Sequence, residues 1–212
     1  MFVRPCWKPG TEKDIHDLID QYPWALVISN GDHGPYATNL PVLLDRTRGE
    51  HGTLVAHIAR ANQHSAVLAN SSSPTLAIFE GPYSYVTGSW YPNRDMPSTV
   101  YYTAVHCYGN VRLQTNEELE RWLAVLTDRM EAPYLNGWKM NDIDRSGVTR
   151  RLQHILGFEI PIERIEGKFK LGQDEPRKDA MAVMQKLAAS DDASHRLLSE
   201  MVRSHNEDRA ER

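Results

Sequence analysis

Residues Trp24-Ala25-Leu26-Val27-Ile28-Ser29 form a short apolar run that is closed by Asn30-Gly31-Asp32. An Asn-Gly pair directly after an apolar run is a strong signal for a β-hairpin turn. We therefore predict that a partner strand follows over residues 36–44 and pairs antiparallel with the first. This hairpin favours a fold built on antiparallel β-structure.

The same pattern of short strands continues along the chain. Further strands are predicted over residues 53–59, 75–87, 100–114 and 158–171, with a bulge at Gly109. Helices are predicted over residues 14–22, 62–70, 119–130, 146–156, 181–187 and 197–202. Thr115 and Glu118 form a capping box before the third of these helices, and the charged end from Ser204 to Arg212 is expected to fray. Together they indicate an α+β fold that is mainly β: a barrel of about six antiparallel strands with peripheral and C-terminal helices.

Composition is that of an ordinary globular protein. The 212 residues carry 24 Lys and Arg against 28 Asp and Glu, a net charge of −4, which argues against a protein that coats nucleic acid. Only Cys6 and Cys107 are present, which excludes a disulfide framework and argues against a cysteine-based zinc module. We expect one main domain over residues 1–190, followed by a C-terminal helix and charged tail over residues 191–212.

The beginning of the chain holds Arg4 and Lys8 but lacks the apolar stretch of a signal peptide, and no apolar run approaches the length of a membrane span. We therefore expect a soluble, cytoplasmic protein that does not enter a membrane.

The stretch from His57 to His64 is the densest group of functional residue types. It runs from an apolar strand into a helix start, where free N–H groups and Arg60 could hold an anion. His57 and His64 could ligate a metal, but their spacing alone slightly favours ordinary structural roles. No common catalytic motif such as HExxH, GxSxG or GxGxxG is present.

Two aromatic clusters follow. One runs from Gly81 to Tyr91, and the other is the predicted strand on which Tyr102, His106 and Tyr108 share one face. Aromatic residues at this density can enclose a flat cofactor, although in a barrel they usually fill the core. Cys107 is expected to be buried, because the sequence supplies no activating neighbour.

These clusters, in this order, resemble the PaiB-like "FMN-binding negative transcriptional regulator" family. The matching segments are Ala56-His57-Ile58-Ala59-Arg60-Ala61-Asn62, Gly81-Pro82-Tyr83-Ser84-Tyr85 with Ser89-Trp90-Tyr91, Tyr102-Thr103-Ala104-Val105-His106-Cys107-Tyr108-Gly109, and Gly157-Phe158-Glu159-Ile160 with Glu166-Gly167-Lys168-Phe169-Lys170-Leu171-Gly172-Gln173. The resemblance implies a split β-barrel homodimer with a cofactor site at or near the subunit interface. It also implies that Arg60, Asn62, Trp90, Lys168 and Gln173 lie near that site.

The chain departs from the family pattern at two places. Asn-Pro-Gln-Trp of the family is replaced by Asn62-Gln63-His64-Ser65, and the Trp of Pro-Thr-Trp-Asn-Tyr is replaced by Val100. Two lost indoles would widen a pocket by on the order of 100 Å³, and His64 adds an imidazole. A wider pocket with a new histidine suits haem b, whose iron takes a proximal His. The chain therefore looks like the haem-dependent piperazate synthases within this family.

That branch implies a reaction and roles for several residues. L-N5-hydroxyornithine would be cyclised to L-piperazate by N–N bond formation with loss of water, with His64 as ligand of the haem iron. Tyr101, and next His106, are the candidates for proton transfer, and Arg60 or Lys168 could hold a carboxylate. The alternatives are an FMN-binding regulator or flavoprotein, in which His64 is only a polar residue at a helix start, and a haem storage or degradation protein. The sequence contains no recognisable helix-turn-helix, so direct DNA binding is the weaker part of the regulator hypothesis.

Overall fold

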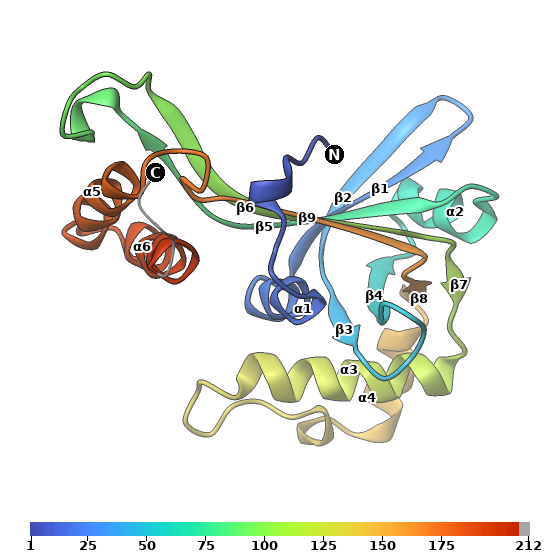
Figure 1. Ribbon diagram of the computed structural model, residues 1–212. Coiled ribbons are helices and arrows are strands. Elements are labelled where there is room, and N and C mark those ends of the chain that lie inside the picture. The colour runs from blue at the N-terminus through green and yellow to red at the C-terminus, as the bar shows by residue number, and fades with distance from the viewer. Residues whose placement is uncertain (208–212) are drawn as a thin grey trace. The chain divides into compact units, whose positions relative to one another are not determined.

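The computed structural model describes residues 1–207 and shows a mixed α+β chain (Figure 1). Within these residues the strands are β1 (Trp24–Gly31), β2 (Gly34–Pro41), β3 (Leu43–Asp45), β4 (Thr53–Ala59), β5 (Thr75–Val86), β6 (Thr99–Gly109), β7 (Arg112–Leu113), β8 (Ile155–Pro161) and β9 (Arg164–Lys170). The helices are α1 (Glu12–Gln21), α2 (Gln63–Asn70), α3 (Asn116–Glu131), α4 (Arg145–Leu152), α5 (Arg177–Ala188) and α6 (Ala193–Asn206), with short 3₁₀ turns η1 (Pro5–Trp7), η2 (Gly88–Trp90) and η3 (Met140–Asp142).

The strands form two sheets, with strand orders β2-β1-β5-β6-β9 and β3-β4-β8-β7. The predicted hairpin is confirmed, since β1 and β2 pair antiparallel from Trp24 opposite Pro41 to Gly31 opposite Gly34. In the second sheet β4 pairs antiparallel with β8, with Val55 opposite Glu159 and His57 opposite Gly157. The prediction of an antiparallel α+β fold is therefore confirmed.

The number of strands is larger than predicted because three predicted strands are each divided. Residues 36–44 divide into β2 and β3 after Pro41, which cannot donate a ladder hydrogen bond. Residues 158–171 leave one sheet at the end of β8 and enter the other as β9. Residues 100–114 divide into β6 and β7, and Gly109 is the last residue of β6 rather than a bulge within it. A Cβ atom at this position would lie 2.0 Å from the Pro161 carbonyl oxygen, so the close approach of the two backbones requires glycine.

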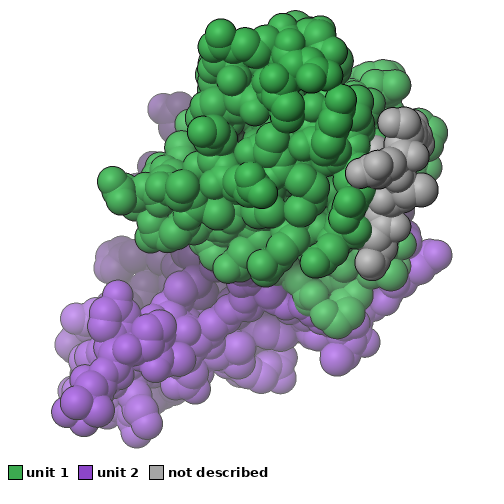
Figure 2. Space-filling model, turned by 60° about the vertical axis from the view of Figure 1, so that its left-hand side comes forward, with its two compact units in different colours: residues 1–18, 80–105, 166–212 green, residues 19–79, 106–165 purple. Residues whose placement is uncertain are grey.

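The chain divides into two compact units, which Figure 2 shows in different colours. Unit 1 comprises Met1–Leu18, Glu80–Val105 and Glu166–Arg212, and unit 2 comprises Ile19–Phe79 and His106–Ile165. Helices α5 and α6 pack against each other in unit 1. The expected division into residues 1–190 and 191–212 remains a prediction.

Each unit has its own buried core. In unit 2, apolar side chains of β4 and β8 such as Leu54, Ile58 and Phe158 are buried, and α3 contributes Leu119. Leu119 also packs with Val148 of α4, so α3 and α4 share a small apolar cluster. In unit 1 the fully buried side chains include Tyr91, Tyr101, Leu171, Leu187 and Leu198. No helix within the described residues is long and apolar enough to span a membrane.

The ends of the helices confirm one prediction from the sequence and correct another. The Thr115 and Glu118 capping box is present at the start of α3, and Asn62 caps α2 by accepting a hydrogen bond from the His64 N–H group. The expected fraying from Ser204 is wrong as far as Asn206, because α6 continues to that residue and its buried amide donates to the Leu171 and Val202 carbonyl groups. Residues 208–212 of that segment lie outside the described part of the chain.

Candidate functional site

His64 lies in the first turn of α2, in unit 2. The chain leaves β4 at Ala59 and turns through Asn62, whose side-chain oxygen accepts the His64 N–H at 3.0 Å. This cap fixes the position of the first helical turn, and with it the direction in which the His64 side chain leaves the backbone. The His64 side chain is almost fully buried, at 1% exposure.

The two ring nitrogens of His64 have different surroundings. Nδ1 lies 2.9 Å from the hydroxyl of Thr38 on β2, and the Asn62 amide donates to the same hydroxyl at 3.5 Å. Nε2 is buried and has no hydrogen-bond partner among the described residues. The Tyr36 ring lies beside the imidazole, with ring centroids 6.0 Å apart. Burial lowers the pKa of His64, so the ring is neutral near pH 7.

This arrangement fits a metal ligand. A ligating histidine is neutral, presents one nitrogen to the metal, and has its other nitrogen held by a hydrogen bond that fixes the tautomer. In His64 the held nitrogen is Nδ1 and the unpaired nitrogen is Nε2. An unpaired buried nitrogen costs free energy in the chain alone, and a metal bond to it would remove that cost. His64 therefore matches the chemistry expected of a haem ligand.

His57, the competing histidine, has a different environment. It lies on β4, and its ring borders a cavity of about 10 Å³ beneath α3 that Gln114 and Trp122 also line. Burial also lowers the pKa of His57. The space is about that of one water molecule, which is too small for a cofactor.

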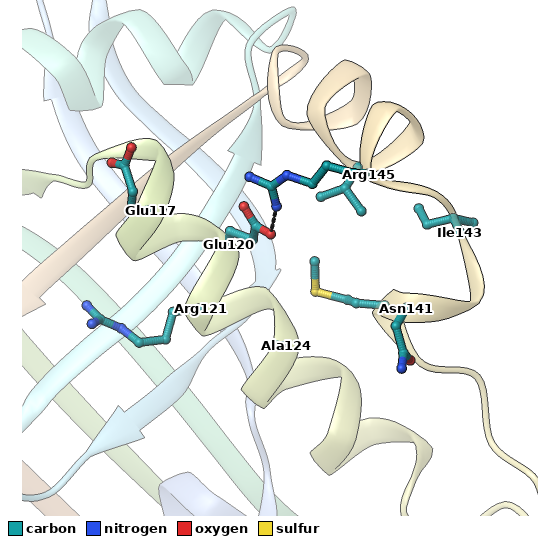
Figure 3. A pocket seen from close by; sticks show the side chains of 9 residues that line it. Glu117, Glu120, Arg121, Ala124, Asn141, Ile143 and Arg145 are labelled. Atoms are coloured by element: carbon teal, nitrogen blue, oxygen red, sulfur yellow. Dashed lines mark hydrogen bonds and ion pairs between the residues drawn. The ribbon is translucent and has the colours of Figure 1, made fainter.

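Arg60 is exposed and borders a pocket between α3 and α4. This pocket has a volume of about 430 Å³ and is lined by Arg60, Asn116, Glu117, Glu120, Arg145, Thr149, Leu152 and Gln153, but not by His64. A second pocket of about 620 Å³ shares Glu117, Glu120 and Arg145 with it (Figure 3). The ion pair between Arg145 and Glu120 joins the two helices across this region. Apart from Arg60, the sequence analysis selected none of these residues.

Four of the predicted site residues lie in unit 1. Trp90 is half-buried in η2, and Lys168 on β9 is buried. Gln173 is also buried, but its amide is engaged by its own loop: it donates to the Phe169 carbonyl at 2.6 Å and accepts from the Leu171 N–H at 2.7 Å. The roles of these residues at a cofactor site remain predictions.

Tyr101, the fourth, belongs to a buried polar cluster. Its hydroxyl donates to Glu175, and the Tyr91 hydroxyl donates to the other oxygen of the same carboxyl group at 3.0 Å. Burial, and then the charge of Glu175, raise the pKa of Tyr101 far above its usual value. Burial likewise raises the pKa of Glu175. Tyr101 is therefore fixed as a hydrogen-bond donor.

His106 lies on β6 in unit 2 and is half-buried. Its Nδ1 is 3.4 Å from the hydroxyl of Tyr108, and the Arg164 guanidinium lies 3.5 Å above the Tyr108 ring. At this separation the imidazole and the phenol make a weak hydrogen bond. Cys107, between them in sequence, is buried as predicted, and burial raises the pKa of its thiol.

The sequence analysis did not select several residues that define these environments. The sequence did not indicate Thr38 and Tyr36 as neighbours of His64, because they lie in a predicted hairpin to which only a structural role was given. Glu175 lies two residues beyond the last matching motif, and only its acidic side chain before a helix could have drawn attention to it.

Comparison with known proteins places the chain in a family. A family model described as "Putative FMN-binding domain" matches residues 1–164. The chain belongs to this family. It is also 24% identical over 202 residues to "Protease synthase and sporulation protein PAI 2" of Bacillus subtilis, covering 95% of this chain and 96% of that protein. The predicted PaiB-like resemblance is thus confirmed.

Solved structures share the fold at low sequence identity. The "FAD and Heme binding protein" of Mycobacterium smegmatis has a TM-score of 0.56 and 17% identity over 77% of this chain and 73% of that one. The flavocytochrome Anf3 of Azotobacter vinelandii has a TM-score of 0.56 and 12% identity over 77% and 69% of the two chains. The split-barrel fold predicted for this FMN-binding family member is therefore confirmed.

Proposed function

We propose that this chain is a haem b-dependent enzyme that converts L-N5-hydroxyornithine to L-piperazate. In this reaction the α-amine nitrogen bonds to N5, the N5–O bond breaks, and the hydroxyl leaves as water with a proton from the amine. The observation that carries the haem assignment is the buried, neutral His64, with Nδ1 held by Thr38 and Nε2 unpaired. The substrate assignment comes from the family resemblance, and solved proteins of this fold that are named for flavin and haem support a cofactor of either type.

The residues around His64 would determine how the haem is held. His64 Nε2 would bind the iron, while Thr38 and Asn62 keep the imidazole in one orientation and one tautomer. When bound, haem supplies a Lewis-acidic iron that weakens an N–O bond. Ser65, where the family has Trp, is buried and donates its hydroxyl to the Arg60 carbonyl, so it contributes no bulk to a pocket.

The α-amine must lose a proton before its nitrogen can attack N5. Of the two predicted proton-transfer residues, half-buried His106 suits this role better, because its side chain is partly accessible and an imidazole nitrogen can accept a proton. Tyr101 is enclosed and its hydroxyl already donates to Glu175, so it suits a fixed polar role. We propose Arg60 and Lys168 as the residues that hold carboxylates of substrate or cofactor.

The proposal includes a homodimer acting in the cytoplasm. A split barrel leaves apolar surface on each subunit, and two-fold pairing is the commonest way to cover it. Sedimentation of the cofactor-bound protein at micromolar concentration should give a dimer, and a monomer would contradict this part.

The alternative is an FMN-binding flavoprotein or regulator, with which the description of the family agrees. The absorption spectrum separates the two. A Soret band in protein purified from haem-supplied cells supports haem, whereas stoichiometric FMN without haem would refute both the haem and the enzyme assignments.

The decisive variant is His64→Ala, with His57→Ala as its matched control. His64→Ala should remain folded, lose the native Soret position, bind haem more than about 100-fold more weakly and lose turnover of L-N5-hydroxyornithine. His57→Ala should keep the native Soret position, because His57 borders only a water-sized cavity. An unchanged haem spectrum in His64→Ala would show that another residue binds the iron. Turnover by the wild-type protein distinguishes an enzyme from a haem carrier.

A further inference from the structure

A cavity in unit 2 lies between α3, α4 and the segment that joins them through η3 (Figure 1). Its volume is about 210 Å³. Seven of the nine residues that line it have apolar side chains, and the other two are Thr127 and Arg151. None of the nine is among the predicted site residues, and His64 does not line the cavity.

The apolar walls of the cavity belong to the small core cluster of α3 and α4. Val148 and Leu152 are buried in that cluster, and Met140 and Ile143 of the connecting segment pack against it. Trp138 also lines the cavity and is 43% exposed, so the space opens to solvent beside an aromatic ring. The cavity is therefore bounded by a packed core and can be reached from outside.

The two polar residues of the cavity have unused hydrogen-bond donors. Thr127 on α3 is half-buried, and its hydroxyl makes no hydrogen bond within residues 1–207. The Arg151 guanidinium donates to the Gly147 carbonyl of its own helix at 3.0 Å and forms no ion pair in the same part of the chain. The Asp144 carboxylate, at the start of that helix, accepts instead from the Gly147 N–H and the Ser146 hydroxyl. Because a guanidinium has five N–H donors in a fork that matches a carboxylate, Arg151 can bind one.

We propose that this cavity binds a small organic acid with an apolar ring, the ring lying between the apolar walls and the carboxylate on Arg151. An engineered apolar cavity of about 150 Å³ binds benzene, so this larger space accommodates a ring with a short side chain. Trp138 and Met140 favour an aromatic ring, because indole and thioether groups both attract one. Arg151 is exposed whereas the walls are buried, so the acid group stays at the solvent side. The proposal does not depend on which cofactor the chain takes.

The test compares phenylpropionate with its uncharged amide, phenylpropionamide, which differs only in the group that would meet Arg151. Both are titrated by calorimetry into wild type, Arg151→Met and the control Arg150→Met. Arg150 is an exposed neighbour on the same helix and does not line the cavity. Wild type and Arg150→Met should bind the acid about 10-fold more tightly than the amide, whereas Arg151→Met should bind the two alike.

Thr127→Leu tests whether the ring enters the cavity. The larger apolar side chain occupies part of the space, so this variant should lose binding of both ligands. Its Tm should equal or exceed that of wild type, because an unpaired hydroxyl in an apolar cavity is replaced by an apolar group.

Three results would overturn the proposal. The first is a wild-type protein that does not bind phenylpropionate at millimolar concentration; if Thr127→Leu then also changes the sedimentation of the protein, the occupant is an apolar side chain of a second copy of this chain. The second is a preference for the acid that survives in Arg151→Met or is lost equally in Arg150→Met, which would place the carboxylate elsewhere. The third is unchanged binding by Thr127→Leu, which would place the ring outside the cavity.

Discussion

Replacing Glu159 by Gln should destabilise unit 2 substantially. Glu159 on β8 is 1% exposed, and its carboxylate accepts two hydrogen bonds from Arg48, two from Arg112 and one from Gln114. The amide of Gln removes the charge and turns an N–H donor toward guanidinium groups that are themselves donors. Burial alone would raise the pKa of Glu159, but the hydrogen bonds from Arg48, Arg112 and Gln114 lower it overall.

The size of the effect follows from burial. Breaking a buried ion pair costs about 3–5 kcal/mol. The side chains of Arg48 and Arg112 are 39% and 45% exposed, so both can turn partly to water after the substitution. We therefore expect a loss of about 2–4 kcal/mol, or about 4–16 °C in Tm for a chain of this length.

Thermal melts of wild type, Glu159→Gln and Glu118→Gln provide the assay. Glu118 contacts the same Arg112 from the solvent side, so Glu118→Gln should change Tm by no more than about 2 °C. Folding lowers the pKa of Glu159. Its contribution to folding stability is therefore fully present above the pKa of glutamate in the unfolded chain, near 4.3, and is lost as the pH falls through the pKa in the folded chain. Glu159→Gln should therefore lose less stability than wild type on acidification. If Glu159→Gln melts within 2 °C of Glu118→Gln, the network does not stabilise the fold.

Two further substitutions test the Thr38 hydroxyl that contacts His64 and the buried carboxyl group of Glu175. Thr38→Val should leave the fold intact but weaken haem binding by about 10-fold or more and shift the Soret band, because Nδ1 of His64 loses its partner; an unaltered haem titration would contradict this. Glu175 has a raised pKa through burial, so its stabilisation is present below about pH 4.3 and is lost as the pH rises through the folded pKa. In melts from pH 4 to 9, the Tm of wild type should therefore fall as the pH rises, and the Tm of Glu175→Gln should depend less on pH. Parallel curves of Tm against pH for the two proteins would refute the raised pKa of Glu175.

Local features of the fold could be predicted because their causes are local in sequence. The hairpin signalled by Asn30-Gly31-Asp32 and the capping box at Thr115 each depend on residues within a few positions of one another, and both are present, although Asn30 and Gly31 pair within β1 and the turn itself lies at Asp32 and His33. The division of residues 158–171 between two sheets could not be predicted, because alternation of apolar residues does not show which sheet a strand joins.

The candidate site was predictable only in part for the same reason. The histidine at position 64 could be selected from the sequence, but the features that make it a ligand candidate are not local. Its partner Thr38 is 26 residues away, and the unpaired state of Nε2 depends on everything that packs around it. Lys168 on β9 likewise lies against the rings of Phe2 and Trp7 at the other end of the chain.

Glu159 and Glu175 show how far such partners decide chemistry. Both are buried glutamates near the end of the matched motifs, and the sequence gives no reason to treat them differently. Glu159 meets Arg48, 111 residues away, whose charge stabilises the carboxylate, so its pKa is lowered. Glu175 meets the neutral hydroxyl of Tyr101, 74 residues away, which does not offset the cost of burial, so its pKa is raised. The charge state of a buried carboxyl group therefore depends on its contacts in the folded chain. Low pH should reduce the contribution of Glu159 to stability, and high pH should reduce that of Glu175.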